Sequence, residues 1–123
     1  MRRLLPLSVV AALWSASAQA QAPIRVIDGD TIAVRGTTIR IIGLDAPELH
    51  GRCPAETALA RAARDRLAEL LRDGASVWRR GRDRYGRTLA VVRDAAGRDV
   101  AGLLVAEGLA RAYDGRGPRR GWC

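Results

Sequence analysis

The feature that most constrains the fold is a change of hydrophobic period partway along the chain. Three short runs rich in β-branched residues come first, at residues 24–27, 31–34 and 38–44, separated by glycine and aspartate. β-Branched side chains favour strands, and the glycine and aspartate between them favour turns. From Pro54 to Leu71, apolar side chains instead recur every three or four residues, as in an amphipathic helix. The pattern predicts three successive strands followed by one long helix.

Two further strands and a second helix complete the pattern. The strands are predicted at residues 75–79 and 87–93, and Asp99 is placed to cap a short helix. Trp78 is expected to pack inside the sheet structure, whereas the Gly- and Arg-rich tail, residues 114–122, is expected to be irregular. Five short strands with one long and one short helix predict an α+β chain, a small, partly open β-barrel with helices of the OB type.

The first 20 residues have the layout of a secretory signal peptide. Arg2 and Arg3 precede an apolar run, residues 4–14, and an Ala-Gln-Ala site ends at Ala20. The run is shorter than the roughly 20 residues that a membrane-spanning helix needs. We therefore expect cleavage after Ala20, a domain over residues 21–123, a periplasmic or secreted location, and no membrane anchoring afterwards. An uncleaved anchor or a buried helix is the alternative.

Export changes the interpretation of the two cysteines. Cys53 and Cys123 would lie in an oxidising compartment, where two thiols usually pair. The loop closed by that bridge is worth about 4 kcal/mol in the chain-entropy account. Two free thiols or an intermolecular link are the alternatives.

The charge balance points to an anionic partner. The chain has 21 basic residues, all arginine, against 13 acidic ones, and a formal net charge of +8. Nucleic acid and acidic surfaces are the partners that such an excess favours. Two cysteines and one histidine exclude a four-cysteine zinc site and any mechanism that needs two histidines.

Acidic residues cluster where two of the predicted strands end. Asp28 and Asp30 flank a glycine at the first strand break, and Asp45 and Glu48 flank an Ala-Pro pair after the third strand. If the fold brings these ends together, their oxygens form a weak site for Ca²⁺ or Mg²⁺. Aspartates beside glycine also make simple turns, so each pair alone is ambiguous. Arg40, inside an apolar run, must face water or an anion.

The joint order of these residues resembles the staphylococcal nuclease (thermonuclease) family. The matching motifs are Asp28-Gly-Asp30-Thr31, Arg40-x4-Asp45-x-Pro47-Glu48, Asp83-Arg-Tyr85-Gly86-Arg87-x-Leu89-Ala90 and Glu107-Gly108-Leu109-Ala110. The resemblance runs from about Ile24 to Tyr113. It implies the family's five-stranded OB barrel and a metal-dependent phosphodiesterase, an endonuclease that cuts DNA and RNA with little sequence specificity.

The resemblance also implies a role for each matching residue. Asp30 and Asp45 would bind one Ca²⁺ ion, with the Ala46 carbonyl as a third ligand, and Asp28 would lie next to that site. Mg²⁺ or Mn²⁺ is the alternative cation. The remaining roles are phosphate contact by Arg40 and Arg87, activation or orientation of water by Glu48, and nucleotide contact by Arg84, Tyr85 and Tyr113.

Elementary electrostatics agrees with most of these roles. Two fixed guanidinium groups and a cation would meet the negative charge that develops on a phosphodiester during hydrolysis. The same positive groups should lower the pKa of Glu48, which weakens it as a base.

A non-catalytic OB module that binds single strands is the alternative function, although it has no reason to keep Arg40, Glu48 and Arg87 together. A protein that binds an acidic or membrane surface is a third. No protein partner is implied, and the resemblance favours a monomer.

Overall fold

The computed structural model describes residues 22–123, so the predicted signal peptide lies outside the described residues. The elements in chain order are β1 (Ile24–Asp28), β2 (Thr31–Val34), β3 (Thr37–Ile41), β4 (Gly43–Asp45), α1 (Pro54–Leu70), β5 (Ala75–Arg82), β6 (Thr88–Asp94), α2 (Val100–Ala106) and β7 (Arg111–Tyr113). Between residues 22 and 123, no helix is both long and apolar enough to cross a membrane.

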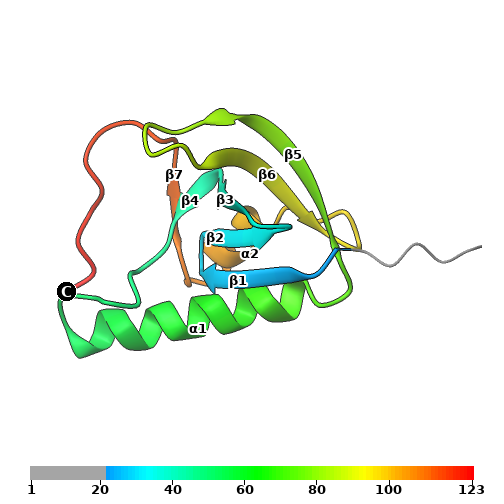
Figure 1. Cartoon of the computed structure of the whole chain (residues 1–123). Coiled ribbons are helices and arrows are strands. Elements are labelled where there is room, and N and C mark those ends of the chain that lie inside the picture. The colour runs from blue at the N-terminus through cyan, green and yellow to red at the C-terminus, as the bar shows by residue number, and fades with distance from the viewer. Residues whose placement is uncertain (1–21) are drawn as a thin grey trace, which may run out of the picture.

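Five strands form one mixed sheet in the order β1-β2-β3-β6-β5. The first three are antiparallel neighbours, β3 runs parallel to β6, and β5 returns antiparallel beside β6. Helix α1 packs along β1, on the side of the molecule opposite β5 (Figure 1). The five-stranded sheet with one long and one short helix is the arrangement that the sequence predicts.

The third predicted strand is divided in two. β3 ends at Ile41, and Gly43 adopts φ 101°, a left-handed conformation that favours glycine. β4 then turns away and pairs with β7, which the sequence pattern did not predict, so that Gly43 lies opposite Tyr113. This small second sheet brings the chain near its C-terminus against the segment that carries Asp45.

The core lies between the sheet and the two helices. Its large, fully buried side chains come from four strands and both helices: Ile32, Ile39, Ile41, Leu44, Leu67, Val92, Val100 and Leu104. Trp78 is not among them, contrary to expectation, because it is 55% exposed. Side chains alternate across a strand, and in β5 it is Val77 that packs against the core.

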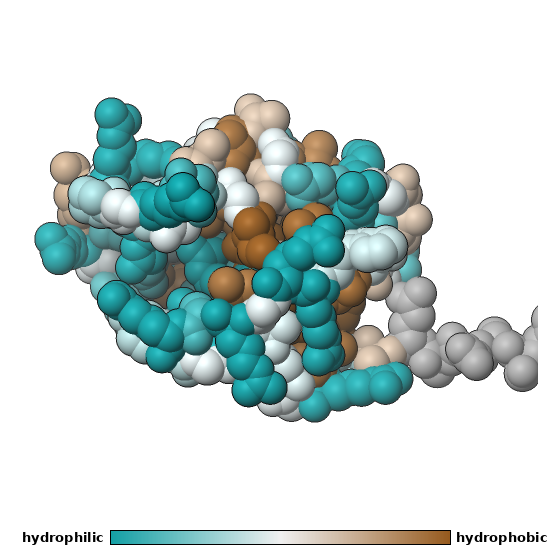
Figure 2. All heavy atoms as spheres, turned by 90° about the horizontal axis from the view of Figure 1, so that it is seen from above, coloured by the Kyte–Doolittle hydropathy of each residue, from teal (hydrophilic) through white to brown (hydrophobic). Residues whose placement is uncertain are grey.

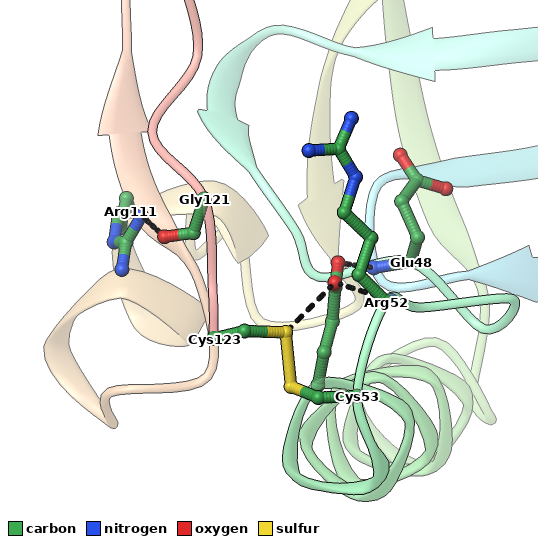
Figure 3. The surroundings of a disulfide bond; sticks show 7 residues. Glu48, Arg52, Cys53, Arg111, Gly121 and Cys123 are labelled. Carbon is green, nitrogen blue, oxygen red and sulfur yellow. Dashed lines mark hydrogen bonds between the residues drawn. A yellow bond between two sulfur atoms is a disulfide. The ribbon is translucent and has the colours of Figure 1, made fainter.

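A disulfide between Cys53 and Cys123 confirms the predicted pairing and ties the last residue to the start of α1. The irregular tail is held at further points (Figure 3). The Arg111 guanidinium stacks 3.8 Å from the centre of the Trp122 ring and donates to the Gly121 carbonyl at 2.9 Å. The Tyr113 hydroxyl donates to the Gly117 carbonyl at 2.7 Å. The tail is therefore irregular, as predicted, but anchored along its length.

Candidate functional site

Asp30 links the β1–β2 turn to the segment that follows β4. Its Oδ2 accepts a hydrogen bond from the Ala46 N–H at 3.0 Å, and its Oδ1 accepts one from the Thr31 hydroxyl at 2.9 Å. Asp28 accepts from the Asp30 N–H at 3.1 Å. Burial, together with a hydrogen bond to Asp30 and that residue's charge, raises the pKa of Asp28 to about 7. The two strand ends that carry the predicted carboxylates are thus brought together.

Arg40 joins the two predicted metal-binding carboxylates. Its Nη1 lies 3.2 Å from Asp30 Oδ2, and its Nη2 lies 3.9 Å from Asp45 Oδ1. The Arg40 side chain is only 11% exposed, and it also donates to the carbonyls of Ile41 at 3.1 Å and Leu44 at 3.2 Å. The anion that a guanidinium in this strand requires is therefore supplied by the protein itself.

Glu56 shapes the loop that presents Glu48. Its buried carboxylate accepts from the backbone N–H groups of Glu48 at 3.1 Å and Arg52 at 3.0 Å, and these bonds hold its pKa below the ordinary value. A Cβ at Gly51 would lie 2.6 Å from Glu56 Cγ, so glycine is required there. An acid in the first turn of a helix is common, so no sequence pattern pointed to this second role of Glu56.

The Glu48 side chain is 56% exposed, and the protein's own groups raise its pKa above the ordinary value. Partial burial and the negative charge of Asp30 raise the pKa of Glu48, and they outweigh the lowering by Arg119. The sequence expectation included two arginines and a bound cation, whereas among the protein's own groups a single arginine, Arg119, lowers this pKa and the carboxylates raise it.

Arg119 is the site residue that sequence reasoning missed. Its Nη1 lies 3.2 Å from Asp45 Oδ1 and 3.7 Å from Glu48 Oε1. The tail contains several arginines, and 74 residues separate this one from Asp45, so no local signal distinguished it. The disulfide at Cys123 holds the tail close to the loop on which Glu48 lies (Figure 3).

Most of the predicted site residues line two neighbouring cavities, although Asp28 and Asp30 line neither. The larger, of about 690 Å³, is lined by five of them: Arg40, Arg84, Tyr85, Arg87 and Tyr113. The smaller, of about 340 Å³, is lined by Asp45, Ala46 and Glu48. Arg119 borders both cavities. Arg40 and Arg87 thus share one hollow, while Glu48 opens into the adjoining one.

A tight turn between β5 and β6 presents Arg87 and Tyr85. Asp83 Oδ1 accepts from the backbone N–H groups of Tyr85 and Arg87, both at 2.9 Å, and Asp83 Oδ2 accepts from Arg87 Nε at 2.7 Å. The Tyr85 ring is 70% exposed, with the guanidinium groups of Arg84 and Arg87 at 5.0 and 5.7 Å from its centre. Among residues 22–123, Asp83 is the one ion-pair partner of Arg87.

The same turn occurs again at the other end of β6. Asp94 and Arg98 repeat the Asp-x-x-Gly-Arg spacing, with Arg98 Nε donating to Asp94 Oδ2 at 2.8 Å and the Arg98 N–H donating to Oδ1 at 2.8 Å. Arg98 lines neither cavity. The chain therefore contains two copies of one turn, of which one borders the candidate site.

The donor set around Asp30 and Asp45 suits a hard divalent cation. Two carboxylates and the Ala46 carbonyl are oxygen donors of the kind Ca²⁺ prefers, and both carboxylates approach one guanidinium, that of Arg40. Within residues 22–123, no three Asp, Glu, His or Cys side chains gather around one metal position. A cation here would rely on water for most of its coordination, as the sequence predicts.

Comparison with known proteins gives consistent matches. Residues 38–121 match the family model for staphylococcal nuclease homologues. The micrococcal nuclease of Shigella flexneri is 36% identical over 73% of this chain and 56% of its own length. The succinoglycan biosynthesis protein ExoI of Rhizobium meliloti (strain 1021) is 34% identical over 75% of this chain and 52% of its own length. The chain spans about half the length of these curated relatives.

Proposed function

Because this chain belongs to the staphylococcal nuclease family, we propose that it is a calcium-dependent endonuclease that hydrolyses phosphodiester bonds of DNA and RNA with little sequence specificity. The observation that carries the proposal is that Arg40 and Arg87 line one cavity, with Asp45 and Glu48 next to it. A phosphodiester is the anion that two convergent arginines fit best.

Arg40 and Arg87 stabilise the phosphate as it gains negative charge. Arg87 lines the larger cavity and is held through Nε by Asp83, so its guanidinium is in place before a ligand arrives. Arg40 is fixed by Asp30 and Asp45 and by two carbonyls, which keeps its guanidinium in place before substrate arrives. Preorganised charge of this kind costs no rearrangement when the reaction occurs.

Asp30, Asp45 and the Ala46 carbonyl would hold the cation. When bound, it supplies positive charge beside the phosphate and makes a nearby water easier to ionise. The Ala46 N–H bond to Asp30 fixes the spacing of these groups. Asp28 accepts a hydrogen bond from the Asp30 N–H and so helps to position that residue.

Glu48 orients the attacking water and accepts its proton. Glu48 lines the cavity that Asp45 and Ala46 also line, so its carboxylate lies beside the proposed cation site. Oxygen from water bonds to phosphorus, the bond from phosphorus to the leaving sugar oxygen breaks, and that oxygen takes a proton from solvent. Arg84, Tyr85 and Tyr113 contact the nucleotide, with the exposed Tyr85 ring as a stacking surface.

Export to the periplasm or medium, and action as a monomer, are part of the proposal. The disulfide between Cys53 and Cys123 supports export, because such bonds persist in oxidising compartments.

A cleavage assay tests the proposed function. Plasmid DNA, single-stranded DNA and RNA are incubated with the purified protein in Ca²⁺ and then in chelator, with Glu48→Gln as the matched control. We expect cutting of all three in Ca²⁺, none in chelator, and none by the variant. Retarded but intact nucleic acid would instead support a binding module without catalysis, and cutting that persists in chelator would refute metal dependence.

A further inference from the structure

The outward side of β5 and β6 carries the exposed ring of Trp78 beside the half-buried side chains of Val91 and Leu89. Trp78 lies opposite Val91 and Ser76 lies opposite Arg93 in the antiparallel register. Facing positions of paired strands point to the same side of a sheet. Together with Leu89, two residues from Val91 along β6, these residues form what is called below the β5–β6 outer face.

The β5–β6 outer face is continuous with the larger cavity. Leu89 of β6 lies opposite Arg40 of β3 in the parallel register, and both line that cavity. Each pair of residues along a strand advances by roughly 7 Å, so Val91 and its neighbour Trp78 lie one step beyond Leu89. A chain leaving the cavity along β6 therefore meets Trp78 next and Arg93 after it.

The strands and the turn that carry this face also carry arginines without an acidic partner in the described part of the chain. On β5, β6 and the turn between them, the exposed arginines without an ion-pair partner within residues 22–123 are Arg79, Arg80, Arg82, Arg84 and Arg93. The acids that bracket β6, Asp83 and Asp94, are already paired within their own turns. Seen from above, apolar side chains occupy the middle of the molecule's surface and hydrophilic ones gather around them (Figure 2).

We propose that the β5–β6 outer face binds the single-stranded stretch of polynucleotide adjoining the nucleotides in the cavity. One base stacks on Trp78, and Arg93 and its neighbours hold the phosphates. An exposed indole with unpaired arginines beside it supplies the two contacts that single strands use, stacking and phosphate attraction. Bases inside a duplex are already stacked, so this surface selects single strands. The inference rests on the proposed function, because it extends the strand held at Arg40 and Arg87.

The binding test uses Glu48→Gln as the background, so that cleavage does not consume the probe. Fluorescence anisotropy measures its affinity for a labelled single-stranded dinucleotide and for an oligonucleotide of about ten nucleotides, within the site sizes of OB folds. Adding Trp78→Ala should weaken binding of the longer probe by about 5- to 100-fold, the effect of one lost stacking contact. Dinucleotide affinity should not change. Trp78→Phe should keep most of the affinity.

A matched pair of arginines provides the control. Arg93→Ala should weaken the longer probe and flatten its salt dependence, whereas Arg61→Ala, an exposed arginine on α1, should do neither. Unchanged affinity of Trp78→Ala for the longer probe, or an equal loss for both probes, would overturn the proposal. The proposal would also be overturned if Trp78→Ala weakened binding to anionic lipid vesicles without weakening binding to the oligonucleotide. If the wild-type chain cuts no substrate at all, the proposed function fails, whatever these affinities are.

Discussion

The Asp-x-x-Gly-Arg turn occurs at both ends of β6, with equivalent Arg87–Asp83 and Arg98–Asp94 bonds. Comparing variants of the two arginines therefore distinguishes the proposed catalytic role of Arg87 from its structural role. Arg87→Ala removes the 2.7 Å bond to Asp83, a pair whose side chains are 35% and 16% exposed. Such a pair is worth at most about 1 kcal/mol, or about 4–8 °C in Tm for a domain of this size. The backbone bonds from residue 87 to Asp83 survive the substitution, so the variant should remain folded.

The effect on catalysis should be much larger than the effect on stability. Loss of one preorganised charge donor costs about 3–4 kcal/mol in the transition state, which is about 10²- to 10³-fold in kcat. Arg98→Ala breaks the equivalent bond in the other turn, and it should lower Tm by a similar amount while leaving kcat unchanged. Single-turnover cleavage and thermal melts of both variants supply the measurement. Equal losses of activity in the two would mean that Arg87 acts only through its turn, and no loss in either would refute its role.

Three further outcomes follow from the structure. Cys123→Ser, which opens the 70-residue loop to Cys53, should lower the free energy of unfolding in urea by about 4 kcal/mol; an unchanged value would contradict this. The Arg98 N–H and guanidinium hold the pKa of Asp94 below its ordinary value, so its stabilisation is present at neutral pH and is lost as the pH falls below about 4. The difference in Tm between wild type and Asp94→Asn should accordingly shrink from pH 6 to pH 3, and a constant difference would argue against the ion pair. Leu104→Ala, at a fully buried position, should cost about 2–5 kcal/mol in the same urea titration, and a smaller loss would mean that the core closes around the gap.

Much of the site was accessible from the sequence because its residues lie in local patterns. The turn that holds Arg87 needs only Asp83, Gly86 and the intervening residues, so its geometry is encoded within five positions. The carboxylates of Asp30 and Asp45 stand at strand ends, and antiparallel pairing of β2 with β3 carries Thr31 opposite Arg40. The geometry of such short segments depends little on the rest of the fold.

Features that depend on packing between distant segments were not accessible. In β5, Val77 packs against the core, and the next residue, Trp78, therefore lies on the outer side of the sheet. Alternation of side chains alone does not determine which of these two residues faces the core. The pKa of Glu48 depends on how close Asp30 and the tail approach it, which no spacing in the chain reports.

The sequence by itself determined the five strands of the main sheet, both helices and the turn that carries Arg87, because each rests on interactions between neighbours in the chain. Only the tertiary structure decided that β7 pairs with β4, that Glu48 opens beside the arginine cavity, and that Arg119 reaches Asp45. These contacts join segments that are far apart in the chain, so forming them costs loop-closure entropy. Burial in the complete fold and the Cys53–Cys123 disulfide offset that cost, and no local segment does so alone.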